Sequence, residues 1–171
     1  MLLSVILLSV ILFLLLLLSM VWPPDSPWAP WWRTNTKTAK AICKLANIDN
    51  KDIVYDLGCG DGEVLLQAAK RGAKGVGIEI DPLRVFIAKA RVFINNFNDK
   101  IIIKRNNFFN EKYSDATVII VYLVPKTLER LKTKFLQELK PGVLIVSYKY
   151  EIDLPLIAYD KRNEIRVYKT L

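Results

Sequence analysis

The sequence predicts a doubly wound α/β domain that follows one N-terminal transmembrane helix. The sheet is indicated by two apolar runs in the middle of the chain. The β-branched run Ile53–Leu57 passes into three alternate glycines, Gly58, Gly60 and Gly62, and an apolar stripe with helical spacing follows them. The next apolar run ends at Glu79. Strand, glycine loop, helix and strand in this order form half of a nucleotide-binding sheet, whose ligand is expected at the carboxyl ends of the strands.

The first segment, residues 1–22, is predicted to be a transmembrane anchor. Its first 21 positions contain no charged side chain, and at about 1.5 Å per residue they would form about 30 Å of helix, enough to cross a bilayer. A cleaved signal peptide would instead need a basic start, a shorter apolar core and a small-residue cleavage site. Because Arg33, Lys37, Lys40 and Lys44 follow the segment, the positive-inside rule predicts a single-pass membrane protein with its folded domain in the cytoplasm.

Residues 23–33 are predicted to be an interfacial linker, since they are rich in tryptophan and proline. An aromatic belt at the membrane surface is the simpler explanation of this composition. The alternative is a lid over the ligand site, with Trp31 or Trp32 as one wall. Residues 34–171 then form the folded domain, which has the length of a single domain.

Strands and helices alternate through the rest of this domain. Thr34 or Thr36 is expected to cap a helix that runs to Asn47, before the first strand. Beyond Glu79 the pattern predicts a helix from Pro82, a strand at 101–104, a strand at 116–122, a helix from Pro125, a strand at 143–148 and a hairpin of 156–159 with 164–169. The run at 116–122 is almost wholly apolar, which is typical of a central parallel strand that is covered on both faces.

The composition excludes several kinds of chemistry. The chain contains no histidine and only two cysteines, Cys43 and Cys59. Histidine-dependent triads, histidine acid–base catalysis and zinc sites are therefore excluded, and no metal is expected. The net charge of +8 comes from dispersed lysines and arginines. Their dispersion favours a solvated surface over attraction to lipid headgroups, and no nucleic acid partner is expected.

The spacing of the glycine loop indicates the ligand. The order G-x-G-x-G differs from the dinucleotide fingerprint G-x-G-x-x-G, and no Gly-Lys-Ser/Thr of a P-loop follows. The segment from Asp56 to Gly62 resembles the first motif of class I (seven-β-strand) methyltransferases, Rossmann-like enzymes that bind S-adenosylmethionine. The glycines allow close backbone approach, and Asp56 is expected to accept the ammonium group of the cofactor. Glu79 is expected to accept the ribose hydroxyls. The cofactor-binding candidates are Asp56, Gly58, Cys59, Gly60, Asp61, Gly62, Glu79, Ile80, Asn107 and Phe108.

The methyl acceptor is expected beside the end of the 116–122 strand. Tyr122 is the candidate catalytic residue, because its hydroxyl or backbone could hold an incoming amine and its ring could contact the cation. The substrate-lining candidates are Trp31, Trp32, Leu123, Pro125, Tyr148 and Tyr150. The last two tyrosines are equally compatible with ordinary strand residues.

A closer resemblance covers residues from Pro27 to Tyr150. The chain is similar to small protein-lysine methyltransferases, namely the archaeal broad-specificity enzymes and the membrane-anchored mitochondrial relatives that modify the adenine nucleotide translocase and the ATP synthase c-subunit. The resemblance depends on the proline-aromatic lead-in and on the segments 54–62, 75–82, 107–109 and 122–125. It implies that Asn107 contacts the adenine and that Tyr122 lies at the lysine channel.

The sequence therefore predicts methyl transfer from S-adenosylmethionine to a protein lysine at or near the membrane. The expected partners are the bilayer, through residues 1–22, and a protein substrate. Methylation of a lipid or quinone headgroup is the alternative activity, motivated by the anchor. A non-catalytic membrane scaffold that retains the fold is the alternative from a different class of function.

Overall fold

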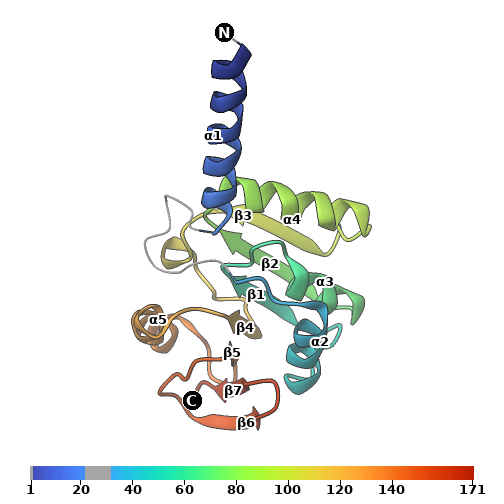
Figure 1. Cartoon of the computed structure of the whole chain (residues 1–171). Helices are drawn as coiled ribbons and strands as arrows, with labels where there is room; N and C mark the ends of the chain where they lie inside the picture. The colour runs from blue at the N-terminus through green and yellow to red at the C-terminus, as the bar shows by residue number, and fades with distance from the viewer. Residues whose placement is uncertain (1, 22–31) are drawn as a thin grey trace.

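The computed structural model describes residues 2–21 and 32–171, with side chains described at 3–18 and 32–171 (Figure 1). The helices are α1 (Leu2–Val21), α2 (Thr36–Leu45), α3 (Glu63–Lys70), α4 (Pro82–Ile94) and α5 (Pro125–Glu138), with a 3₁₀ turn η1 at Phe108–Asn110. The strands are β1 (Ile53–Leu57), β2 (Lys74–Glu79), β3 (Ile101–Arg105), β4 (Val118–Val121), β5 (Leu144–Tyr148), β6 (Leu156–Asp160) and β7 (Ile165–Lys169).

The strands form one seven-stranded sheet in the order β3-β2-β1-β4-β5-β7-β6. The five strands from β3 to β5 are parallel, whereas β7 runs antiparallel to both β5 and β6. The strand order reverses between β1 and β4, and this position is where a doubly wound sheet binds its ligand. The predicted doubly wound sheet and its final hairpin are confirmed, as Figure 1 shows.

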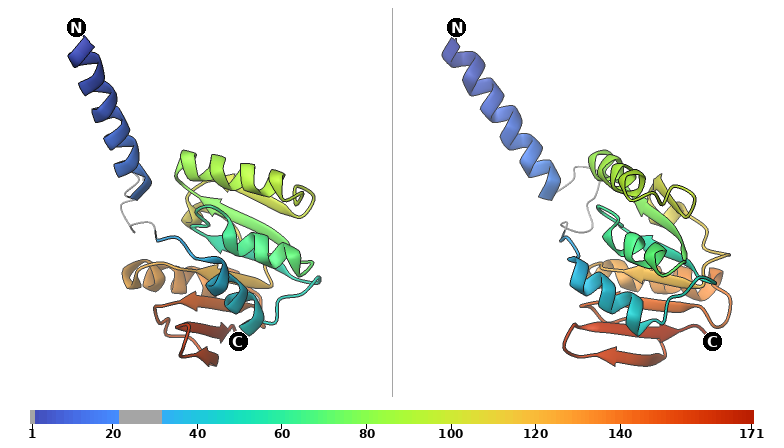
Figure 2. Two further views of the ribbon diagram at one scale, coloured as in Figure 1. Left: turned by 45° about the vertical axis from the view of Figure 1, so that its right-hand side comes forward. Right: turned by 90° about the vertical axis from the view of Figure 1, so that its right-hand side faces the viewer.

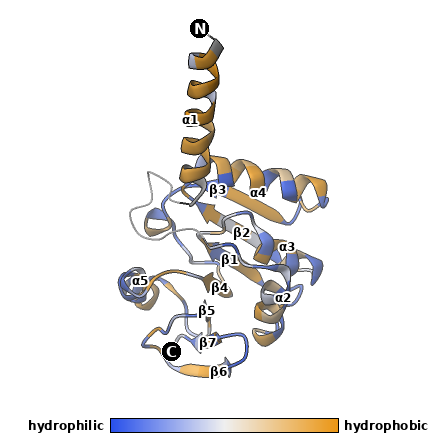
Figure 3. Ribbon diagram, viewed as in Figure 1, coloured by the Kyte–Doolittle hydropathy of each residue, from blue (hydrophilic) through white to orange (hydrophobic). Residues whose placement is uncertain are grey.

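Helices cover both faces of the sheet (Figure 2). On one face, α2, α3 and α4 pack on a core that includes Val54 of β1 and Ile120 of β4. On the other face, α5 packs on a core that includes Tyr55 of the same β1 and Ile119 of the same β4. Neighbouring residues thus point to opposite faces, as strand geometry requires, and these central strands are buried on both sides. Figure 3 shows that α4 has hydrophobic and hydrophilic residues, as expected for a helix packed on one side.

The helix that precedes β1 is capped by a residue other than the two predicted. The Asn35 side chain accepts a hydrogen bond from the Thr38 backbone N–H at 2.9 Å, and Thr36 is the first helical residue. An asparagine side chain fits this geometry as well as a threonine does, because either oxygen can accept from the third amide of a helix. The helix also ends at Leu45 and not at Asn47, which has a left-handed φ of 51°.

The predicted transmembrane anchor requires correction. Although α1 forms a helix, no helix among the described parts of the chain is long and apolar enough to cross a membrane. The predicted single-pass membrane location loses its basis with the anchor. Residues 23–31 of the predicted linker, Trp31 among them, lie outside the described residues.

Candidate active site

A pocket opens at the carboxyl ends of the central strands, where the doubly wound topology places a ligand. Twelve of the predicted site residues line it: Trp32, Asp56, Gly58, Cys59, Asp61, Glu79, Ile80, Asn107, Phe108, Tyr122, Leu123 and Tyr148. These residues come from the ends of β1, β2, β4 and β5 and from the segments beside them. Cofactor and acceptor candidates therefore share one pocket, although their individual roles remain predictions.

Four predicted residues do not line this pocket. Gly60 donates its backbone N–H to the Glu79 carboxylate, whereas Gly62 is the N-cap of α3 with a left-handed φ of 75°. Pro125 is the first residue of α5, and Tyr150 packs against the ring of Tyr122.

Sequence reasoning missed six residues that do line the pocket: Thr34, Ile42, Glu63, Val64, Arg84 and Ile120. Glu63 and Val64 directly follow the glycine loop, so their proximity to the ligand could have been inferred. Arg84 lies in the first turn of α4, the helix that begins after Glu79. The proximity of Thr34 and Ile42 depends on how the chain before β1 crosses the sheet, which local spacing does not specify.

The glycine loop is fixed to the neighbouring strand. Gly58 and Cys59 donate their backbone N–H groups to the carbonyl oxygen of Ile78 at 2.8 and 3.1 Å. Gly58 has a backbone φ of 80°, which residues other than glycine rarely adopt. Burial raises the pKa of the Cys59 thiol well above its ordinary value, with the nearby Asp56 and Glu79 adding to the effect. The pocket cysteine is therefore a neutral thiol and not a thiolate nucleophile.

Glu79, the last residue of β2, is a buried carboxylate with three backbone donors. Gly60 donates to Oε2 at 2.9 Å, while Ile80 and Asp81 donate to Oε1 at 2.9 and 3.0 Å. These bonds connect the glycine loop to the start of α4. Since each carboxylate oxygen has more than one lone pair, a ligand hydroxyl can still donate to the same carboxylate.

Asp56 has a different environment. It is only 6% exposed, and no hydrogen bond from another described residue to its carboxylate contributes to its pKa. Burial raises its pKa from 3.8 to about 7, and the nearby Glu79 and Asp61 add to the effect. A buried carboxylate in this situation is stabilised by a cation in the pocket. The ammonium group of a bound methionine moiety would provide that cation, so the pocket fits the expected cofactor.

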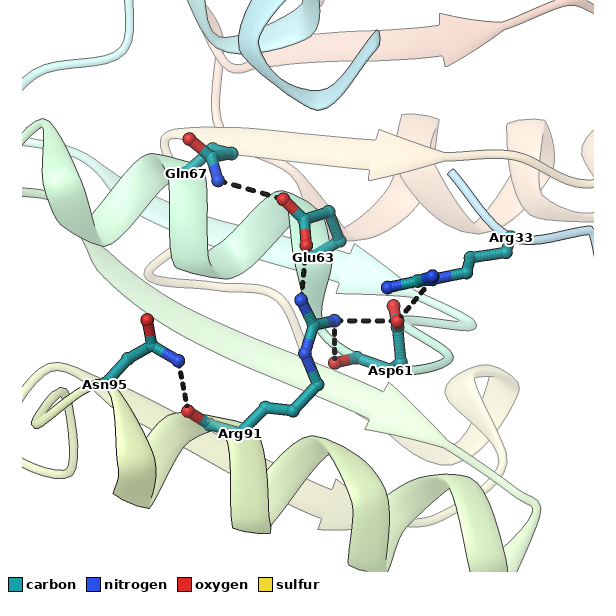
Figure 4. Close-up of polar contacts among 6 residues, drawn as sticks. All are labelled: Arg33, Asp61, Glu63, Gln67, Arg91 and Asn95. Carbon is teal, nitrogen blue, oxygen red and sulfur yellow. Dashed lines mark hydrogen bonds and ion pairs between the residues drawn. The ribbon is translucent and has the colours of Figure 1, made fainter. Parts of the chain in front are cut away.

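The acidic residues after the glycines belong to an ion-pair network (Figure 4). Arg91 of α4 contacts the Asp61 carboxylate at 2.7 Å and also pairs with Glu63. Arg33, which precedes α2, contacts the same Asp61 oxygen at 2.7 Å. Although burial opposes ionisation, hydrogen bonds from Arg91, Thr36 and Gln67 lower the pKa of Glu63 overall. The network fixes the glycine loop between α4 and the segment before α2, and the residues of Figure 4 show how two distant arginines meet there.

Tyr122 and Tyr148 of the pocket lining form a cluster with Tyr150, which lies beside them. The Tyr122 ring centroid lies 4.5 Å from that of Tyr148 and 6.4 Å from that of Tyr150. Burial raises the pKa of the Tyr122 hydroxyl, so it is a neutral phenol at physiological pH. The register that pairs Val121 with Ser147 brings Tyr122 and Tyr148 together, because each follows directly on these partners. The roles of Tyr148 and Tyr150 as a wall of the substrate site remain predictions.

Asn107 and Phe108 lie where β3 turns into η1, and both line the pocket. The Asn107 side chain oxygen accepts a hydrogen bond from the Phe109 backbone N–H at 3.0 Å and so caps the turn. Its amide nitrogen is then the group that can donate to a ligand. The predicted contact of Asn107 with an adenine remains a prediction.

Comparison with known proteins identifies the family. Residues 56–154 match the ANTKMT methyltransferase domain. A protein-lysine N-methyltransferase of Saccharolobus islandicus is 39% identical over 128 residues, which cover 74% of this chain and 80% of the relative. The human lysine N-methyltransferase of the ATP synthase c-subunit is 22% identical over 71% of this chain, and the match spans about half (52%) of that relative.

A solved structure agrees with this assignment. The RNA methyltransferase from Salinibacter ruber, in complex with S-adenosyl-L-homocysteine, has a TM-score of 0.76 and is 29% identical over 81% of this chain and 93% of its own. The predicted resemblance to class I methyltransferases, and with it S-adenosylmethionine as cofactor, is thereby confirmed. The chain therefore belongs to the ANTKMT methyltransferase domain family and is an S-adenosylmethionine-dependent methyltransferase.

Proposed function

We propose that this enzyme transfers a methyl group from S-adenosylmethionine to the side-chain amine of a lysine in a protein. The main support is the tyrosine cluster of Tyr122, Tyr148 and Tyr150 beside the cofactor pocket. Aromatic rings can hold an amine through both its cationic and its apolar parts. The names of the archaeal and human relatives point to the same acceptor.

The cofactor side of the proposal follows from charge. Asp56 pairs with the ammonium group and thereby becomes ionised, while the fixed carboxylate of Glu79 accepts the ribose hydroxyls. Asn107 and Phe108 then flank the adenine. When bound, S-adenosylmethionine supplies a methyl group on a positively charged sulfur, which is activated for direct displacement. The glycine loop allows the backbone to approach this ligand closely.

The acceptor side follows from the neutral phenol of Tyr122. Its hydroxyl oxygen accepts a hydrogen bond from the lysine ammonium and orients the amine, and Leu123 and Tyr148 form the walls that exclude water. A lysine must lose its proton before it attacks, and a poorly hydrated aromatic site favours the neutral amine. The residues of this chain then contribute alignment and desolvation of the amine, and they do not need to supply a dedicated acid.

The test is transfer of a labelled methyl group from S-adenosylmethionine into a host-cell extract by the purified enzyme. Products are separated into protein, organic-solvent and nucleic acid fractions, and the protein is hydrolysed for amino-acid analysis. The expected result is label in methyl-lysine, and loss of that label with the Asp56→Ala variant. Label in the organic-solvent fraction would instead identify a lipid or quinone acceptor. Label in RNA would identify the kind of acceptor named for the Salinibacter relative.

A further inference from the structure

Lys149 directly follows β5 in a strained turn beside the tyrosine cluster. Its φ is 74°, and the Tyr150 backbone N–H donates to the carbonyl oxygen of Tyr148 at 3.0 Å, so Lys149 is the central residue of a γ-turn with positive φ. This conformation is unfavourable for a residue other than glycine and persists only where the surrounding structure enforces it. Here the Lys149 backbone N–H donates to the backbone carbonyl of Glu164 at 2.8 Å, and the Arg166 guanidinium donates to the Lys149 carbonyl at 3.0 Å.

The turn places Lys149 between Tyr148 and Tyr150, whose rings both pack against the ring of Tyr122. Its ammonium lies close enough to the hydroxyl of Tyr122, a residue that lines the pocket, for the two groups to interact. The proposed function gives the same place to the ammonium of the substrate lysine. Lys149 itself is exposed, so its four-carbon side chain can move between solvent and the tyrosines.

We propose that Lys149 is an internal methyl acceptor, modified by the active site of its own chain when no substrate is bound. The inference rests on the proposed function, because it requires an enzyme that accepts lysine amines. The Lys149 ammonium first loses a proton to solvent. Its nitrogen then bonds to the methyl carbon while the carbon–sulfur bond breaks and its electron pair stays on sulfur, leaving S-adenosylhomocysteine. Methylation thus replaces an N–H donor at the Tyr122 hydroxyl with a methyl group.

The experiment incubates the full chain with labelled S-adenosylmethionine and no added substrate, and locates the label by mass spectrometry of chymotryptic and Glu-C peptides. We expect methyl-lysine at position 149. The Lys149→Arg variant should lower the total label at least tenfold. The matched control is Lys126→Arg, which changes an exposed lysine near the start of α5 and should leave the label unchanged. Circular dichroism of each variant excludes misfolding as the cause of a lost signal.

Intramolecular transfer makes a separate prediction. The rate of labelling per enzyme molecule should stay constant over a hundredfold range of enzyme concentration. When Asp56→Ala chains are mixed with active Lys149→Arg chains, the Asp56→Ala chains should stay unlabelled at Lys149. Labelling of those chains, or a rate that rises in proportion to concentration, would overturn transfer within one chain.

The host-cell extract separates this inference from the proposed function. If the enzyme methylates lysines of extract proteins but Lys149 stays unmodified, the internal acceptor is wrong and the proposed function stands. If neither Lys149 nor any extract lysine is labelled although S-adenosylhomocysteine binds in calorimetry, both are wrong.

Discussion

Replacement of Asp56 by asparagine is predicted to stabilise the empty enzyme at neutral and alkaline pH. The pKa of Asp56 is raised from 3.8 to about 7 in the folded protein, mainly by burial. The folded state therefore binds this proton more tightly than the unfolded state does. The associated stability is fully present below about pH 4, and it is lost as the pH rises through about 7.

The magnitude follows from this difference in pKa. Each pH unit corresponds to about 1.4 kcal/mol, so about three units give about 4 kcal/mol of stability lost between pH 4 and pH 8. Asparagine keeps the shape of the side chain and does not titrate. If the asparagine amide finds no hydrogen-bond partner in the pocket, the free energy of unfolding falls by about 1–3 kcal/mol at every pH. The informative quantity is therefore the pH dependence of the difference between Asp56→Asn and wild type, and not its absolute value.

The assay is urea unfolding followed by circular dichroism between pH 4.5 and pH 8, with and without S-adenosylhomocysteine. Without ligand, the stability of the variant relative to wild type should increase from pH 4.5 to about pH 7 and then level off. With ligand, wild type should gain stability because the ammonium group compensates the carboxylate, whereas the variant should gain much less. A pH-independent difference would refute the burial argument. An equal gain from the ligand in both proteins would refute the pairing of Asp56 with the ammonium group.

Three further predictions concern the loop and the acceptor side. Arg91→Gln should destabilise the protein by about 3 kcal/mol, because it leaves two largely buried carboxylates without their shared cation. The same change should weaken S-adenosylhomocysteine binding in calorimetry. The control is Lys89→Gln, on the exposed side of the same helix, which should change neither quantity. Tyr122→Phe should lower the rate of lysine methylation at least tenfold, while the dissociation constant of S-adenosylhomocysteine should change by less than twofold. A rate equal to that of wild type would show that the hydroxyl has no role in the mechanism. Gly77→Ala should lower the free energy of unfolding in urea by about 1–3 kcal/mol, because an added Cβ would lie 2.7 Å from the Cys59 sulfur and force the glycine loop to move. An unchanged unfolding midpoint would show that the loop can move without a loss of stability.

The sequence predicted best those parts of the site that lie within one strand and the loop that follows it. Asp56, Gly58 and Glu79 are at the ends of adjacent parallel strands, so alternation and spacing were sufficient to place them at one edge. Tyr122 and Tyr148 follow the same rule at the ends of the next two strands of the sheet, β4 and β5. In each case the local pattern and the topology lead to the same position.

The parts that were missed depend on contacts between distant segments. Arg33 and Arg91 both bind Asp61, yet neither is near it in sequence, and most lysines and arginines are exposed to solvent. The γ-turn at Lys149 has no glycine to mark it, and its backbone is bonded to Glu164, just before β7, and to the side chain of Arg166 in β7. The predicted membrane span failed for another reason: uncharged composition alone does not establish a helix of sufficient apolar length.

The antiparallel strand β7 carries the chain away from the pocket. Because Tyr148 pairs with Ile165 and Leu144 pairs with Lys169, β7 begins at the pocket end of the strands and finishes at their opposite end. The exposed Leu171, two residues after β7, therefore lies away from the pocket, whereas Trp32 is part of the pocket wall. A dye or an affinity label attached at Leu171 would leave the pocket open, whereas one attached at Trp32 would obstruct it.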